Sequence, residues 1–395
     1  MKLDIMDRHY LDYNSTTPVD QRVLAEMLPF FTEHFGNASS NTHTFGWYAK
    51  GAIDKARQQV ADFIVAEPSE IIFTSGATES INMALKGVFE AYQSKGNHII
   101  TCKTEHKAVL DTCTYLEEKG AIITYLNVDR EGRIDLDELK ESFTDQTILV
   151  CIMAANNETG VLQDVEKIAQ LTHQHDAIFM SDTTQLAGKL PIDVNEMGVD
   201  LCCISAHKLY GPKGVGALYV RRKNPRVNLL PLFHGGQHES GKRSGTLNVT
   251  GIVGLGKACE IAAAEFWDTN MQVSKLRGFF EHQLLEIPEM LINGSTRYRL
   301  YNTSNLYFPP LQDGSSVFSH LKNKYAVSLG SACTSANAEP SHVLLSMGLS
   351  KVESEHCIRF SLGKQTQMEE VQALTELILN LYGLKLVIKI GRAHV

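Results

Sequence analysis

The sequence lacks the features that mark several common classes of protein. Its eight cysteines include no Cys-x-x-Cys pair, which excludes a simple zinc knuckle, and a disulfide framework is not expected in so long a chain. No stretch approaches the roughly 20 apolar residues of a membrane helix, and charges interrupt residues 1–8, so no signal peptide is expected. A formal net charge of −8 argues against nonspecific binding to nucleic acid or anionic membranes. These absences favour a cytoplasmic globular protein with no direct nucleic-acid or membrane partner.

The size and composition are those of a globular protein with a large core. The chain has 395 residues, of which 43% are hydrophobic and 21% charged, and it is long enough for two domains. Four cysteines lie in apolar runs and are expected to be inert core residues: Cys102, Cys151, Cys202 and Cys203.

Short apolar runs alternate with helix-like stretches between about residues 70 and 220. The runs predict buried strands at residues 71–74, 98–101, 122–125, 148–152, 177–180 and 217–220. Such alternation is typical of an α/β fold with a mostly parallel sheet, in which ligands bind at the carboxyl ends of the strands. After about Gly256 longer helices dominate, including one at 366–382, which predicts a second, smaller domain.

The segment Ser205-Ala206-His207-Lys208 follows an apolar run and leads into a glycine-rich turn. A lysine in this place can form a Schiff base with an aldehyde cofactor, although most lysines are solvated surface charges. Asp182 follows another apolar run and could hold the protonated ring nitrogen of pyridoxal phosphate, with Gln185 near the phenolic oxygen. An acid at a strand end is also a common structural cap, but its spacing from Lys208 favours the cofactor.

Three further segments follow predicted strands and could serve the same site. Gly76-Ala77-Thr78-Glu79-Ser80 opens an amphipathic helix and is suited to a phosphate, or is an ordinary helix cap. His106 could stack on the cofactor ring and move protons, though a structural role is common for such a histidine. The loop with Asn157 could bind a phenolic oxygen or a substrate carboxylate, or form a simple turn.

Two residues of the C-terminal part have distinctive surroundings. Arg359 lies in an apolar frame and could bind a carboxylate bidentately, with a structural salt bridge as the alternative. Cys333 lies in a stretch of small and polar residues, 328–337, that is unlike the cysteine-containing core runs. A thiol on such a loop could act as a nucleophile if its surroundings favour the thiolate.

Together these segments resemble the cysteine desulfurases of the iron–sulfur-cluster assembly type, in the class V aminotransferase-like enzymes that use pyridoxal 5′-phosphate (PLP). The resemblance extends over nearly the whole chain and rests on a specific combination of segments: residues 11–18, 73–80, 103–110, 210–214, 243–246, 330–335 and 358–363.

The resemblance implies a fold and a set of site residues. The fold is the type I PLP-dependent transferase fold, with a seven-stranded, mostly parallel sheet in a large domain (18–259) and a smaller α+β domain (1–17 and 260–395) that carries the cysteine loop. The implied catalytic residues are Cys333, Lys208 and His106. The implied cofactor-binding residues are Ala77, Thr78, His106, Asp182, Gln185, Ser205, His207, Lys208 and, toward the partner subunit's phosphate, Thr246. Asn157 and Arg359 would bind the substrate carboxylate.

The implied activity is conversion of L-cysteine to L-alanine, with the sulfur left as a persulfide on Cys333 of a homodimer. Expected acceptors are an iron–sulfur scaffold protein and tRNA-thiolation proteins. No intrinsic metal site is expected, although Cys333 could transiently ligate a nascent [2Fe–2S] cluster. The alternatives are another class V activity, such as a selenocysteine lyase or an aminotransferase, and a catalytically silent paralogue that binds partners.

The chain departs from the family pattern at a few places. Thr183 and Leu329 replace smaller residues, and Ala38 stands where a proline is usual. The family's longer C-terminal tail is absent, and residues 390–395 match a translated frame of a sequencing adapter, so we expect this end not to be native. These departures bear on scaffold docking and leave the reactive groups in place.

Overall fold

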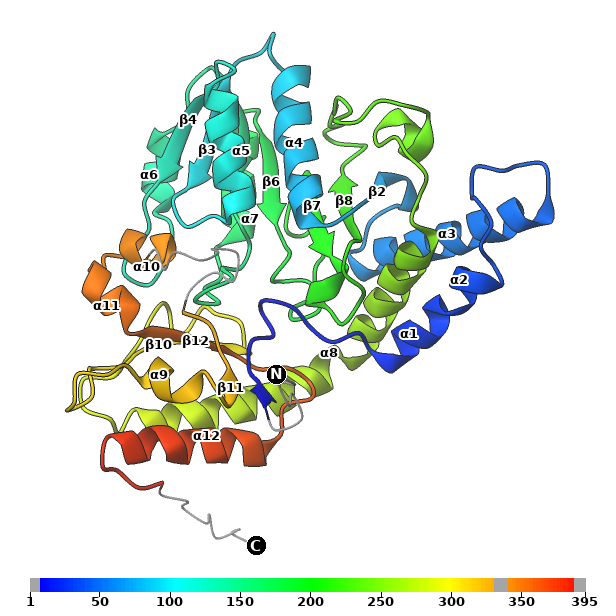
Figure 1. The fold of residues 1–395 in the computed structure, drawn as a ribbon. Helices are drawn as coiled ribbons and strands as arrows, with labels where there is room; N and C mark the ends of the chain where they lie inside the picture. The colour runs from blue at the N-terminus through cyan, green and yellow to red at the C-terminus, as the bar shows by residue number, and fades with distance from the viewer. Residues whose placement is uncertain (1–7, 330–339, 387–395) are drawn as a thin grey trace, which may run out of the picture. The chain divides into compact units, whose positions relative to one another are not determined.

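The computed structural model describes residues 8–329 and 340–386, in two compact units (Figure 1). The larger unit comprises Thr16–Asn157 and Val161–Phe266, and the smaller comprises Met1–Ser15, Glu158–Gly160 and Trp267–Val395. The second boundary, expected after residue 259, lies within the long helix α8 (Val249–Leu284), which contributes residues to both units.

A seven-stranded sheet forms the centre of the larger unit, in the order β2-β8-β7-β6-β5-β3-β4. β8 runs antiparallel to both of its neighbours, and the other adjacent pairs are parallel. Six of the strands, including the antiparallel β2 and β8, are buried along their whole length, which is typical of the sheet of an α/β fold. The strands are β2 (Ile71–Thr74), β3 (His98–Cys102), β4 (Ile122–Leu126), β5 (Thr147–Cys151), β6 (Ile178–Asp182), β7 (Leu201–Ser205) and β8 (Gly216–Val220). The mostly parallel sheet predicted from the apolar runs is therefore confirmed.

Helices α4 (Ala77–Ala91) and α5 (Lys107–Glu117) lie side by side over one face of this sheet (Figure 1). Their apolar side chains, such as Leu85 and Val109, form one core cluster with alternate residues of the strands, among them Met180 and Cys203. The remaining elements of this unit are α1 (Gln21–Met27), α2 (Pro29–Thr32), α3 (Thr44–Phe63), α6 (Leu136–Glu141), α7 (Val165–Gln174) and the 3₁₀ turns Pro68–Glu70, Ala206–Lys208 and His238–Gly241.

The smaller unit is an α+β structure with an antiparallel sheet in the order β12-β10-β9. Its core joins Phe280 of α8 to Leu306 and Phe360 of the sheet and to Ile378 of α12. Two short strands of this unit, β1 (His9–Tyr10) and β11 (Tyr325–Ala326), form a separate parallel pair. The other elements are β9 (Leu291–Ile292), β10 (Thr303–Tyr307), β12 (Cys357–Ser361), α9 (Val317–Leu321), α10 (His342–Ser346), α11 (Lys351–Glu355) and α12 (Met368–Leu381).

Two kinds of feature are absent from the described residues. No helix there is both long enough and apolar enough to cross a membrane. In the same ranges, no three side chains of the His, Cys, Asp and Glu types come together as a metal site.

Candidate active site

The predicted lysine and acid follow two adjacent parallel strands of the larger unit. Asp182 is the last residue of β6, and Lys208 closes the 3₁₀ turn Ala206–Lys208 that directly follows β7. Strands β6 and β7 are neighbours, with Asp182 opposite Cys203 in their register. Parallel strands end at the same edge of a sheet, so both groups belong to the edge at which α/β proteins bind ligands.

The carboxylate of Asp182 has its two oxygens in different environments. Oδ1 accepts a hydrogen bond from the Thr184 N–H at 2.9 Å and another from the thiol of Cys203 at 3.2 Å. Within the described residues no donor reaches Oδ2, although the residue is 6% exposed. A carboxylate oxygen that receives no protein donor can accept one from a ligand, and a protonated ring nitrogen is such a donor.

The Gln185 amide is oriented by a buried lysine. Lys189 Nζ donates to both the backbone carbonyl and the Oε1 atom of Gln185, each at 3.0 Å. Because Oε1 faces the ammonium group, Nε2 is the other end of the amide and can donate. That polarity fits the phenolic oxygen that the sequence assigned to Gln185.

Three strand ends converge on the predicted phosphate loop. Gly216 pairs with Thr74 on one side and with Ser205 on the other, so the ends of β2, β8 and β7 are adjacent. A Cβ on Gly216 would lie 2.7 Å from the Cα of Gly76, so glycine is required for this close approach. Gly76 has φ 150° and is the N-cap of α4, which begins with the predicted residues Ala77 and Thr78. The backbone amides of this helix start and the Ser205 hydroxyl therefore provide donors of the kind a phosphate needs.

His207 is half-buried, and its Nδ1 lies 3.1 Å from Thr16 Oγ1. Burial and, to a smaller extent, the charges of Lys208, Lys213 and Lys189 together lower the pKa of His207 to about 4. The imidazole is therefore neutral at pH 7 in the absence of a bound anion.

His106 is the N-cap of α5, and its ring orientation follows from that position. The Ala108 N–H donates to Nδ1 of His106 at 3.0 Å. In the neutral ring Nδ1 is thus the acceptor, and the proton is on Nε2. A histidine held in this tautomer presents an N–H at its far edge.

A buried glutamate beside His106 was not anticipated as part of the site. Glu105 is completely buried, and its Oε1 accepts the Met153 N–H at 2.7 Å. Burial raises the pKa of Glu105 well above its usual value, and the nearby charge of Asp182 adds to the effect. Asn156 Nδ2 donates to the Thr104 carbonyl at 3.1 Å, so two bonds tie the loop of His106 to the loop of Asn157. In the sequence this glutamate follows the polar pair Lys103-Thr104, which gives no indication of its burial.

The other candidates of the larger unit are more exposed. Asn157 is half-buried, and Thr246 is exposed in the segment that follows the 3₁₀ turn His238–Gly241. Exposure of Thr246 is compatible with the predicted contact to a partner subunit, which stays a prediction.

Arg359 belongs to the smaller unit and lies in the middle of β12, opposite Asn305 of β10. It is 1% exposed, and its Nη2 donates to Asp12 Oδ1 and to Ser15 Oγ, each at 2.7 Å. The structural salt bridge that the sequence left open is therefore present, and substrate binding by Arg359 stays a prediction. Cys333 lies outside the described residues.

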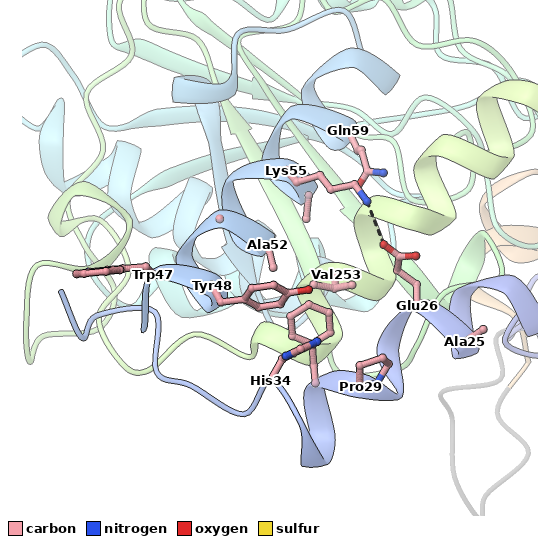
Figure 2. Close-up of a pocket in the computed structure, with 13 residues that line it drawn as sticks. Ala25, Glu26, Pro29, His34, Trp47, Tyr48, Ala52, Lys55, Gln59 and Val253 are labelled. Atoms are coloured by element: carbon pink, nitrogen blue, oxygen red, sulfur yellow. Dashed lines mark hydrogen bonds and ion pairs between the residues drawn. The ribbon is translucent and has the colours of Figure 1, made fainter. Parts of the chain in front are cut away.

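A separate pocket of about 570 Å³ lies in the larger unit among α1, α2, α3 and α8 (Figure 2). Tyr48 and His34 lie with their ring centroids 4.1 Å apart, and Lys55 pairs with Glu26 at 3.0 Å. None of the site residues predicted from the sequence lines this pocket.

Comparison with known proteins identifies the family of this chain. The model of the family described as aminotransferase class-V matches residues 9–374. The cysteine desulfurase IscS of Histophilus somni is 50% identical over 373 residues, which are 94% of this chain and 91% of that protein. The same-named protein of Haemophilus influenzae is 51% identical over 373 residues, again 94% of this chain and 91% of its own. A solved structure described as a NifS-like protein has 39% identity and a TM-score of 0.87, covering 95% of this chain and 99% of its own. Another, described as SspA in complex with cysteine, has 38% identity and a TM-score of 0.80, covering 91% of this chain and all of its own.

The chain belongs to the aminotransferase class-V family and, within it, to the cysteine desulfurases. Enzymes of this kind depend on PLP, and the residues present fit that cofactor. Asp182 offers a carboxylate oxygen for the ring nitrogen, Gln185 a donor for the phenolic oxygen, Lys208 an amine for the aldehyde, and the start of α4 a phosphate site.

Proposed function

We propose that the protein is a cysteine desulfurase that converts L-cysteine to L-alanine and leaves the sulfur as a persulfide on Cys333. One observation carries the proposal. Asp182, a buried residue, ends β6, and the lysine-bearing turn Ala206–Lys208 directly follows the adjacent strand β7. PLP, when bound there, supplies the electron sink that makes bonds of the substrate amino acid labile.

The residues of the chain hold and protonate the reactants around that group. Asn157 and Arg359 bind the substrate carboxylate, for which the planar guanidinium is suited. His106 carries its proton on Nε2 and transfers protons at the substrate. The Cys333 thiolate attacks the substrate sulfur, so the carbon–sulfur bond of the substrate breaks and a sulfur–sulfur bond forms. One of the two thiol protons ends on the methyl group of alanine, and the other remains on the persulfide.

The wider assignments belong to the same proposal. Thr246 completes the phosphate site of a second subunit, which makes the protein a homodimer with two active sites. The persulfide is passed to an iron–sulfur scaffold protein, where Cys333 transiently contacts a nascent [2Fe–2S] cluster, and to proteins of tRNA thiolation. The expected compartment is the cytoplasm. The family membership and the exposure of Thr246 support these assignments.

The Cys333→Ala variant tests the reaction. It should bind PLP and show the yellow colour of the bound cofactor, yet form no protein persulfide and release alanine at a small fraction of the wild-type rate. Persulfide is measured by alkylation and reductive release, and alanine by amino-acid analysis. The matched control is Cys357→Ser, which changes the other cysteine of the smaller unit, buried in β12, and should keep persulfide formation.

Each alternative gives a different outcome. Undiminished sulfide and alanine production by Cys333→Ala would contradict the role of that thiol. An aminotransferase would yield a keto acid from its amino donor and would not depend on Cys333. A selenocysteine lyase would turn over selenocysteine and leave cysteine nearly unused. A wild-type protein that stays colourless with added PLP would indicate a silent paralogue.

A further inference from the structure

A buried cysteine on the strand beside β6 contacts the carboxylate of Asp182. Cys203 is 0% exposed and is the register partner of Asp182 on β7, so both side chains lie on the same face of the sheet. Its Sγ lies 3.2 Å from Asp182 Oδ1, within the range of a hydrogen bond to sulfur. The expected role of Cys203 as an inert core residue accounts for its burial and leaves this contact unexplained.

We propose that Cys203 is a positioning residue, whose S–H group fixes Oδ1 of Asp182 so that Oδ2 is the oxygen presented to the cofactor ring nitrogen. The inference rests on the proposed function, because it concerns the group that Asp182 binds. It assigns a role to a side chain that does not itself touch the cofactor.

The chemistry of the thiol suits a donor. Burial raises the pKa of Cys203 well above its usual value, and the charge of Asp182 adds to this effect, so the group is S–H at every physiological pH. A carboxylate accepts and does not donate, so the hydrogen in this contact belongs to sulfur. The bond is therefore S–H···O, from a weak donor to a charged acceptor.

Rotation about the last side-chain torsion of an aspartate is soft, so the contacts of its oxygens decide its orientation. Oδ1 receives two donors, the Thr184 N–H at 2.9 Å and the Cys203 thiol, while no donor among the described residues reaches Oδ2. Removal of the thiol leaves Oδ1 with one backbone donor. The two orientations of the Asp182 carboxylate, which exchange its two oxygens, then differ less in free energy. Some of the interaction between Asp182 and the ring nitrogen is then lost.

The strand pair holds the thiol in place from two further directions. Thr183 Oγ1 donates to the backbone carbonyl of Cys203 at 2.7 Å and so fixes the register of β6 against β7. Thr184 Oγ1 lies 3.5 Å from Cys203 Sγ. Consecutive residues of the segment after β6 thus contact the same cysteine, which restricts the position of its sulfur.

A cofactor analogue that has carbon in place of the ring nitrogen isolates the proposed effect. Apo protein is titrated with PLP and with the analogue. The Kd of the analogue divided by the Kd of PLP measures how much the ring nitrogen contributes to binding. In Cys203→Ala this ratio should fall by about 3- to 10-fold, the size expected when one hydrogen bond is removed from a charged network. Cys203→Ser restores a donor and should keep most of the wild-type ratio.

The matched control is Cys202→Ala. Cys202 is equally buried and adjacent in β7, but its side chain points to the opposite face of the sheet. A role in packing alone predicts similar losses of thermal stability in both alanine variants and no change in the ratio for either. An unchanged ratio in Cys203→Ala, with wild-type protein still preferring PLP, overturns the inference and leaves the proposed function intact.

A wild-type protein that binds neither compound overturns the proposed function and this inference together. If Cys203→Ala fails to fold because of the cavity it leaves, Cys203→Val fills that space without a donor and is titrated in its place. A ratio in Cys203→Val equal to that of Cys203→Ser overturns the inference, and a lower ratio in Cys203→Val supports it.

Discussion

The two units place their candidate groups in different ways. In the larger unit Asp182, Lys208 and His106 each stand at or just after the carboxyl end of a strand. In the smaller unit Arg359 stands in the middle of β12, and the residues before and after it in the strand also pair with β10. Groups at strand ends share one edge by topology, whereas a mid-strand group is placed by the packing around its own side chain.

Asp182 and Arg359 therefore differ in where their hydrogen-bond partners come from. The contacts of Asp182 are short-range across β6 and β7, with Oδ2 left for a ligand. The contacts of Arg359 come from Asp12 and Ser15, more than 340 residues away in the sequence. The larger unit thus offers an incomplete polar site, and the smaller unit offers an arginine that is already oriented by protein groups.

The sharpest test of the strand-end site is Lys208→Ala. Loss of the amine that holds the cofactor aldehyde should reduce alanine production by at least about 10³-fold, because the alanine side chain has no nucleophile to replace it. Lys208→Arg is the control for charge, since it keeps the cation and should be equally inactive. A steady-state rate within tenfold of wild type in either variant would contradict the assignment of Lys208.

The next test concerns the arginine of the smaller unit. Arg359→Lys keeps the charge and loses the planar fork, so KM for L-cysteine should rise by about tenfold or more while PLP affinity is unchanged. Asp12→Asn, which removes an ion partner of Arg359, should lower thermal stability with a smaller change in KM. If both variants lose stability equally and neither changes KM, Arg359 is a structural residue alone and the substrate role fails.

The sequence predicts the groups at strand ends better than the contacts that depend on tertiary packing. The strands and the groups at their ends were predictable, because apolar runs mark buried strands and polar residues after them must lie at the sheet edge. The reversed direction of β8 was not, since a fully buried antiparallel strand has the same composition as a parallel one.

Contacts that depend on register were also beyond the sequence. Nothing in an apolar run such as residues 199–204 shows that Cys203, rather than Cys202, faces Asp182, because that depends on how β7 aligns with β6. The burial of Glu105 and the pairing of Arg359 with Asp12 likewise arise from tertiary packing. These residues connect segments that a local pattern cannot relate.

A smaller effect is expected at Thr246. This residue is exposed in its own subunit, so Thr246→Ala should leave the stability of the apo protein unchanged. If its hydroxyl binds the phosphate in a second subunit, PLP affinity should fall by about 2- to 10-fold, the value of one hydrogen bond. Thr246→Ser keeps the hydroxyl and should retain wild-type affinity. Sedimentation of a PLP-loaded, active monomer would overturn the shared site altogether.

A last effect is expected on the pH dependence of stability, and it arises from His207 in the phosphate region of the larger unit. Burial and three neighbouring lysines lower the pKa of His207 to about 4 in the folded apo protein, whereas an unfolded histidine has a pKa of about 6.5. Between these values the unfolded chain binds more protons, so stability falls as the pH is lowered from about 6.5 to about 4. Each pKa unit corresponds to about 1.4 kcal/mol, so we expect a loss of about 1–3 kcal/mol from this residue.

Urea unfolding of apo protein across this range measures the slope. His207→Asn should flatten it, while the same substitution at the exposed His320 should not. Bound PLP should also reduce the slope in the wild type, because a phosphate near His207 favours the protonated imidazole. A slope that is the same in apo protein, in PLP-loaded protein and in His207→Asn would show that His207 does not contact the phosphate. The strand-end site would then have to bind that group through the start of α4 and Ser205 without the imidazole.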